Sequence, residues 1–396
     1  MISFVIALAV LCIGSCLYGR FVSRVFGVDP SRKTPVHTKA DGVDYVLLPT
    51  WKIYLIQFLN IAGLGPIFGA IMGVMFGPAA FLWIVFGTIF GGAVHDFFSG
   101  MLSLRRDGAS LPEIVGEQLG NKVKQVMRGF ALILMILVGA VFVYNPADLL
   151  AMLTPEHLDK MFWIVVIFAY YMAATLLPVD KLIGKLYPVF GFALLFMAVG
   201  ILVMLFVHGD ALPEMWDGFY NHKSDPASSP IFPMMFVSIA CGAISGFHAT
   251  QSPMMARCLG NEKHARIVFY GAMVTEGVVA LIWAAAAIAF TGGYSSLEAT
   301  LAGSSPAVLV NNLSSSWLGA FGGILAILGV IAAPITSGDT ALRSARLIAA
   351  DFMGVEQKNI VKRLAVSIPI FVLCFVIMLL PYEVLWRYFA WCNQEL

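Results

Sequence analysis

The sequence predicts an all-α membrane protein that crosses the bilayer about ten or eleven times. Three observations predict this class: the composition, the length of the apolar stretches and the distribution of the basic residues. Apolar residues make up 60% of the 396 positions and charged residues only 12%, about half the charged share of soluble domains. A soluble fold of this composition would expose more apolar surface than it could cover, whereas lipid solvates such surface.

The apolar stretches are long enough to span a bilayer, because a helix crosses the hydrocarbon core in about 20 residues. Stretches of this length, or close to it, lie at 2–19, 53–76, 79–102, 128–145, 162–178, 188–208, 231–250, 267–291, 317–338 and 365–381, and another begins near 383. That last stretch stops at Leu396, so we expect its helix to be shorter than the others.

The basic residues divide the loops into two sides. Cytoplasmic loops of membrane proteins carry an excess of Lys and Arg. Alternate loops, including the one with Lys181 and Lys185, hold all but three of the 24 basic residues. The exceptions are Lys160, Lys223 and Arg387. Consistent alternation indicates a multi-pass protein whose N-terminus lies outside the cytoplasm.

The first apolar stretch has a second interpretation. Residues 2–17 could be a cleaved signal peptide. No basic residue precedes them, however, and Arg20 and Arg24 follow them. This arrangement favours an uncleaved helix that starts outside and ends in the cytoplasm.

Two predicted spans contain sequences that interrupt helices. The second span contains Ala62-Gly63-Leu64-Gly65-Pro66, and the seventh contains Gly242-Ala243-Ile244-Ser245-Gly246. Glycine has low helix propensity and proline lacks an N–H donor, so both stretches can unwind at membrane depth. Unwound backbone is tolerated there where it lines a cavity and binds a substrate or an ion. The alternative is that small residues let neighbouring helices pack closely.

The two interruptions lie five spans apart, at equivalent positions of two halves of opposite orientation. Residues 53–208 form the first predicted half and 231–396 the second, within a single transmembrane domain (1–396) that begins with an extra helix at 1–26. Corresponding interruptions in inverted halves mark the central site of a transporter. The pattern is similar to the five-plus-five inverted repeat of the leucine-transporter fold. By that analogy, Thr336 and Ser337 resemble the paired hydroxyls of a Na⁺ site.

Ionisable residues at membrane depth are costly and usually functional. His95 and Asp96 come at the end of the third span, where they could cycle a proton or anchor the helix at the interface. His248 follows the second interruption and could titrate, bind an anionic substrate or be a satisfied core histidine. Glu276 lies deep in the eighth span and could hold a proton or join a packing network.

Asp339 is a further candidate for cation or proton coupling. It lies near Arg343 and Arg346 in the sequence, so a salt-bridged inner gate is an equally valid interpretation.

No pattern indicates an enzyme. The sequence contains no P-loop, HExxH or GxSxG motif, so transport would be driven by an ion gradient or run downhill. The net charge of +1 gives no indication of nucleic-acid binding, and the six cysteines show no paired spacing. We expect the bilayer and a small molecule as partners, and no cofactor beyond a coupling H⁺ or Na⁺. The sequence carries no indication of the oligomeric state.

Several motifs together resemble the carbon starvation protein A (CstA) family over nearly the whole chain. They are Asp41-Gly42-Val43-Asp44-Tyr45, Ile61 to Pro66, Gly92 to Phe97, Arg105-Arg106 with Ser110-Leu111, Ile239 to Glu262, Phe269 to Met273 with Glu276, Pro334 to Thr340, and Arg343 to Asp351. The resemblance implies a bacterial inner-membrane transporter that is induced by nutrient limitation and associated with peptide or proton-coupled pyruvate uptake. Family members usually continue beyond the point where this sequence ends.

These observations predict a symporter of small carboxylate-bearing nutrients. The exposed backbone of Ala62–Pro66 and Gly242–Gly246 would bind the carboxylate, with His248 and Gln251 as the nearest polar side chains. Thr336 and Ser337 would bind the cation. The alternative is a membrane nutrient sensor that binds the same substrates without net transport.

Overall fold

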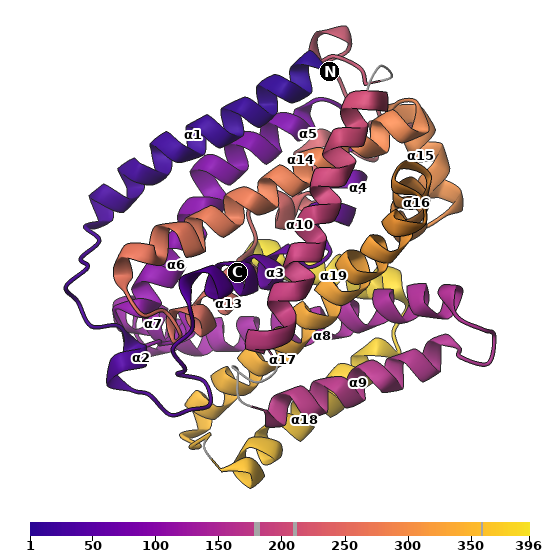
Figure 1. The fold of residues 1–396 in the computed structure, drawn as a ribbon. Helices are drawn as coiled ribbons and strands as arrows, with labels where there is room; N and C mark the ends of the chain where they lie inside the picture. The colour runs from indigo at the N-terminus through magenta and orange to yellow at the C-terminus, as the bar shows by residue number, and fades with distance from the viewer. Residues whose placement is uncertain (178–182, 209–211, 358) are drawn as a thin grey trace.

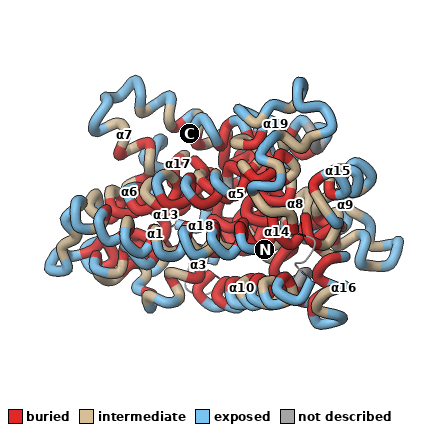
Figure 2. Tube along the Cα trace, turned by 90° about the horizontal axis from the view of Figure 1, so that it is seen from above, coloured by how far each residue is buried: buried red, intermediate tan, exposed pale blue. Residues whose placement is uncertain are grey.

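The computed structural model describes residues 1–177, 183–208, 212–357 and 359–396 (Figure 1). Lys181, which the charge distribution assigns to an inner loop, lies outside these residues. The described chain is helical apart from its loops and one isolated bridge between Leu48 and Leu259. Buried residues occupy the middle of the molecule, and exposed ones lie on its outer helices and loops (Figure 2). The all-α, multi-pass prediction is confirmed.

The first half of the chain begins with one long helix and continues with a broken one. Its elements are α1 (Ile2–Phe26), α2 (Pro35–Thr38), α3 (Thr50–Ala62), the π-helical η1 (Gly65–Gly69), α4 (Ala70–Val74), α5 (Ala79–Leu82), the π-helical η2 (Trp83–Gly92), α6 (Ala93–Leu104), α7 (Leu111–Leu119), α8 (Asn121–Leu153), α9 (Lys160–Leu176) and α10 (Ile183–His208). The short helix α7 is attached to α8 by ion pairs from Glu113 to Lys124 and Arg128.

The second half contains the other broken span. Its elements are η4 (Met215–Asp217), η5 (Ile231–Met235), α11 (Phe236–Ser238), α12 (Ala240–Ala243), α13 (Gly246–Ala256), η6 (Glu262–His264), η7 (Arg266–Tyr270), α14 (Gly271–Thr291), α15 (Tyr294–Gly303), α16 (Pro306–Ala326), η8 (Ile327–Ile331), α17 (Ala332–Met353), α18 (Ile360–Met378) and α19 (Tyr382–Glu395).

Most predicted spans are long apolar helices. Within the described residues, six helices are long and apolar enough to cross a bilayer, or up to eight if each of two bent pairs is one span. The pairs are Thr50–Ala62 with Gly65–Val74, bent by 52°, and Pro306–Leu325 with Leu328–Met353. Of the other three predicted spans, α9 has 17 residues and α19 has 14, and the segment from η5 to α13 is divided into short helices.

Both predicted interruptions are present. In the first, Gly63 ends α3 with φ 28° and ψ −125°, a backbone conformation that residues other than glycine rarely adopt. In the second, Ile244 and Ser245 are fully extended between α12 and α13. Both residues lie within the predicted stretch Gly242–Gly246, whereas Gly242 itself remains helical.

The two broken spans pack directly against each other through small residues. A Cβ atom on Gly69 would lie 2.7 Å from the carbonyl oxygen of Ser238, and one on Gly73 would lie 2.0 Å from Ile239 Cγ1. A Cβ atom on Gly242 would lie 3.7 Å from Pro66 Cα. Unwinding and close packing were alternative interpretations of these glycines, and the structure shows both, at neighbouring positions.

Candidate substrate and proton site

A histidine between two carboxylates lies in the core, just beyond the second interruption. His248 occupies the first turn of α13, Asp96 lies on α6 and Glu276 on α14, and α6 packs against both of the other helices (Figure 1). His248 Nδ1 lies 3.1 Å from Asp96 Oδ2, and His248 Nε2 lies 3.6 Å from Glu276 Oε2. All three side chains are fully buried. The structure therefore joins three residues that the sequence offered only as separate candidates.

His95 connects this cluster to a less buried position. Its Nδ1 lies 3.0 Å from the other carboxylate oxygen of Asp96, and its side chain is 28% exposed. The sequence placed His95 and Asp96 at the end of the third span, but α6 continues to Leu104, about two turns beyond Asp96. The order His95, Asp96, His248, Glu276 is a continuous series of titratable groups from a partly exposed position to a buried one.

The charge of the cluster depends on a single proton. With Asp96 and Glu276 ionised and His248 protonated, the three side chains carry −1 in total, and one further proton makes them neutral. Burial of an uncompensated charge costs several kcal/mol, so the neutral state of the buried cluster is strongly favoured over the state of charge −1. Neither oxygen of Glu276 has a hydrogen-bond partner in the described residues. Glu276 is therefore the position where an added proton costs no existing hydrogen bond.

Two buried amides lie on α3, which packs against α13, and sequence reasoning missed them. Gln57 Nε2 donates to Ser252 Oγ at 3.3 Å, and Ser252 Oγ donates to the carbonyl oxygen of His248 at 3.1 Å. Asn60, one turn further towards the break at Gly63, is fully buried, and its amide has no hydrogen-bond partner in the described residues. Buried polar atoms nearly always have hydrogen-bond partners, so the Asn60 amide and Gln57 Oε1, which have none among the described residues, are candidates for contact with a bound substrate. Their signal in the sequence was two amides, one turn apart, just before the break.

The half-helix that begins at the second interruption is occupied by the chain itself. Asn393 Oδ1, from α19, accepts hydrogen bonds from Ser245 Oγ and from the backbone N–H of Phe247, both at 2.9 Å. A Cβ atom on Gly246 would lie 2.8 Å from the carbonyl oxygen of Asn393. In this conformation Ser245 and Gly246 therefore bind α19, where the sequence predicted a substrate carboxylate.

Gln251 lies one turn after His248 on α13 and is fully buried. Its Nε2 donates to Thr250 Oγ1 at 3.1 Å and to Ser344 Oγ at 3.4 Å, and its Oε1 has no hydrogen-bond partner in the described residues. Of the predicted substrate residues, Gln251 and His248 thus combine burial with a polar atom that has no hydrogen-bond partner in the described part of the chain.

One of the two predicted cation residues, Ser337, lies at the first interruption. Ser337 Oγ donates to the carbonyl oxygen of Leu59 at 3.0 Å and would lie 3.6 Å from a Cβ atom on Gly63. Thr336 Oγ1 donates to the carbonyl oxygen of Ala333 at 2.8 Å. Both hydroxyl oxygens keep lone pairs for a cation, and buried hydroxyl and carbonyl oxygens are the ligands that hard cations prefer. Both hydroxyls fit Na⁺ in chemistry, and Ser337 lies beside the unwound backbone.

Asp339 does not form the arginine gate that its position in the sequence suggested. Its Oδ2 accepts a hydrogen bond from the Tyr187 hydroxyl at 2.6 Å. Arg343 Nη1 and Arg346 Nη2 instead lie 3.4 Å from one oxygen of Asp44, in the loop before α3. Burial opposes ionisation of Asp44, but the two guanidinium groups outweigh it and lower the pKa of this carboxyl group. These contacts attach the loop that carries Asp44 to α17.

Comparison with known proteins identifies the chain. The family described as Carbon starvation protein CstA matches residues 1–157 and 147–315. This chain belongs to the CstA family. An uncharacterized membrane protein of Haemophilus influenzae is 44% identical, over 73% of this chain and 91% of that protein. The match confirms the resemblance drawn from the motifs.

Two Escherichia coli members of the CstA family have transporter names. Peptide transporter CstA is 28% identical over 76% of this chain and 52% of its own length. Pyruvate/proton symporter BtsT is 27% identical over 71% of this chain and 48% of its own length. This chain therefore spans about half the length of these curated relatives.

The structure is similar to a solved transporter. The crystal structure of MhsT in complex with L-phenylalanine superposes with a TM-score of 0.60 at 14% identity, and covers 83% of this chain and 79% of that one. At this identity the similarity shows the fold alone. The fold is the leucine-transporter fold that the two interruptions predicted, whereas the exact boundaries of the repeats, 53–208 and 231–396, stay a prediction.

Proposed function

We propose that this protein is an inner-membrane secondary active transporter that imports small carboxylates such as pyruvate, or peptides, together with protons when nutrients are limiting. The observation that carries the proposal is the buried His248 imidazole between Asp96 and Glu276, beside the second interrupted helix. Family membership and the names of the two E. coli relatives support the transport reaction and both substrate classes.

The cluster can couple the two fluxes through charge. A substrate carboxylate that approaches Gln57, Asn60 and His248 brings one negative charge into a buried region. A proton on Glu276 compensates that charge, so the loaded carrier buries the same total charge as the empty one. The bound proton therefore strengthens the binding of the substrate, and the bound substrate strengthens the binding of the proton, as symport requires.

Proton movement would follow the series of titratable groups. His95, which is partly exposed, passes the proton to Asp96, and His248 turns between Asp96 and Glu276. The 3.6 Å distance from His248 Nε2 to Glu276 exceeds a hydrogen bond, so a small motion of α13 against α14 opens or closes this last step. Rocking of the two broken spans on substrate binding would supply that motion.

A sodium ion at Thr336 and Ser337 is the second candidate for coupling. The hydroxyl of Ser337 lies beside the unwound backbone at Gly63, so an ion there would connect α17 to the first broken span. This site and the histidine cluster are separate groups of residues. Variants at each therefore distinguish the two coupling ions.

Reconstitution into liposomes tests the proposal. Uptake of radiolabelled pyruvate and of a labelled dipeptide would be measured with a pH gradient and a Na⁺ gradient imposed separately. We expect accumulation with an inward proton gradient and no requirement for Na⁺. Substrate binding without accumulation under either gradient would support the sensor alternative. Accumulation that needs Na⁺ and disappears in Thr336→Ala would transfer the coupling role to the second candidate.

A further inference from the structure

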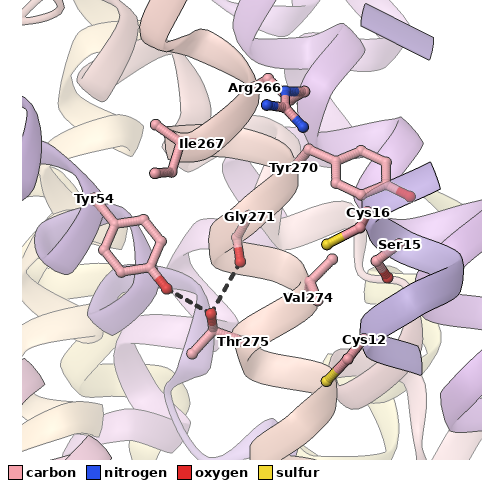
Figure 3. Close-up of a pocket in the computed structure, with 10 residues that line it drawn as sticks. All are labelled: Cys12, Ser15, Cys16, Tyr54, Arg266, Ile267, Tyr270, Gly271, Val274 and Thr275. Carbon is pink, nitrogen blue, oxygen red and sulfur yellow. Dashed lines mark hydrogen bonds between the residues drawn. The ribbon is translucent and has the colours of Figure 1, made fainter. Parts of the chain in front are cut away.

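A cavity of about 340 Å³ opens on the surface of the bundle between α1, α3 and the η7–α14 helix (Figure 3). Cys12 and Cys16 line it from α1, Tyr54 from α3, and Arg266 and Thr275 from the η7–α14 helix. The exposed face of α1 next to it is apolar, with Ile6, Ile13 and Leu17 among its exposed residues. In a bilayer this face contacts lipid, so the cavity opens to acyl chains.

Two polar groups on the wall of the cavity bind each other. The Tyr54 hydroxyl and Thr275 Oγ1 lie 2.5 Å apart, and Thr275 Oγ1 donates to the carbonyl oxygen of Gly271 at 3.0 Å (Figure 3). The surface that the wall presents to a bound molecule is therefore mainly apolar. Thr275 precedes Glu276, which lies buried beside His248, so α14 separates this cavity from the coupling site.

One cation stands at the edge of the cavity. Arg266 is exposed, and no ion pair of its guanidinium occurs within the described residues. It begins η7, on the side that the basic residues identify as cytoplasmic, and Figure 3 shows it at the opposite end of the cavity from Cys12. Arg20 and Arg24 at the inner end of α1 are exposed too. The surface thus combines an apolar groove at membrane depth with positive charge at the level of the inner headgroups.

We propose that this cavity binds one anionic phospholipid of the inner leaflet, with an acyl chain between α1 and α14 and the phosphate on Arg266. The inner leaflet supplies anionic headgroups at that depth, and basic pockets between helices retain them. A polar, water-soluble nutrient would make few favourable contacts with the apolar walls, whereas an acyl chain covers them. The assignment does not depend on the transport reaction.

The native cysteines report occupancy. Cys12 and Cys16 are exposed in the cavity, whereas Cys258, Cys374 and Cys392 are buried. The purified protein would be placed in nanodiscs of phosphatidylcholine, with or without phosphatidylglycerol, and labelled with a membrane-permeant maleimide. We expect phosphatidylglycerol to slow labelling of Cys12 and Cys16 severalfold, and Arg266→Gln to remove the difference. Lys263→Gln, which changes an exposed cation outside the cavity lining, should retain it.

Native mass spectrometry of the wild-type protein gives a second, independent measurement. We expect one phosphatidylglycerol to be retained in preference to phosphatidylcholine. Equal labelling in both nanodiscs, protection that survives in Arg266→Gln, or equal retention of the two lipids would overturn the assignment. Soluble glycerol phosphate should give no protection; if it protects as well as the lipid, the site binds a free phosphate and the lipid proposal fails.

Discussion

Replacement of Glu276 by glutamine removes the buried end of the proposed proton path. The substitution preserves the size of the side chain, and neither carboxylate oxygen has a hydrogen bond to lose. His248 Nε2, at 3.6 Å, then faces an amide that cannot take up a proton. We therefore expect Glu276→Gln to fold and to bind substrate, but to transport without proton coupling.

The structure sets the size of the effect. The cluster changes by one proton between charge −1 and neutrality, so one proton would accompany each substrate monocarboxylate. A gradient of one pH unit is worth about 1.36 kcal/mol for one proton, which corresponds to about tenfold accumulation. Proteoliposomes of the wild-type protein should approach this ratio when the membrane potential is clamped to zero. Glu276→Gln should equilibrate its substrate at a ratio of about one.

Two controls separate loss of coupling from loss of protein. Counterflow exchange of labelled substrate, which needs no net proton movement, should survive in Glu276→Gln. Glu117→Gln, which changes a carboxylate that is 51% exposed on α7, should accumulate substrate like the wild-type protein. If Glu276→Gln still accumulates substrate tenfold per pH unit, Glu276 carries no coupled proton and the proposed path is wrong.

Three further substitutions test other parts of the structure. Asp44→Asn leaves two buried arginines without their carboxylate, a loss of about 3–5 kcal/mol, and should expose Cys258, whose thiol lies against this loop, to maleimide. Asn393→Leu removes two buried hydrogen bonds at about 0.5–1.5 kcal/mol each and should lower the melting temperature, whereas Gln394→Leu at the exposed neighbour should not. Burial raises the pKa of Glu113, but its two ion pairs outweigh burial and hold the pKa below the usual 4.5. Glu113→Gln should therefore have a lower melting temperature than the wild-type protein at pH 7. This difference should disappear as the pH falls through the lowered pKa of Glu113, because the carboxyl group then loses its charge. A difference that persists in strong acid would exclude the ion pairs as its cause.

Local chemistry made both interruptions predictable. Gly63 must adopt a positive φ, and Pro66 lacks a donor, so the first break follows from the residues themselves. The second break lies within the predicted stretch Gly242–Gly246, but Gly242 stays helical and packs on its neighbours, whereas Ile244 and Ser245 unwind. Which residue unwinds depends on tertiary contacts that the local sequence does not contain.

Long-range contacts account for what the sequence did not reveal. His95, Asp96, His248 and Glu276 were each recognised from their cost in a membrane, but their meeting depends on how α6, α13 and α14 pack. The partner of Arg343 was missed because Asp44 lies in an irregular loop about 300 positions earlier, which no helical spacing connects to α17. Asn393 was passed over for the same reason.

Simultaneous measurement of substrate and proton entry tests the central claim most directly. Liposomes that contain the purified protein and a trapped pH-sensitive dye would receive external pyruvate in Na⁺-free buffer, with the membrane potential clamped. The account predicts acidification of the interior at the rate of pyruvate entry, and loss of that acidification in Glu276→Gln while exchange continues. Pyruvate entry in the wild-type protein at unchanged internal pH would contradict it.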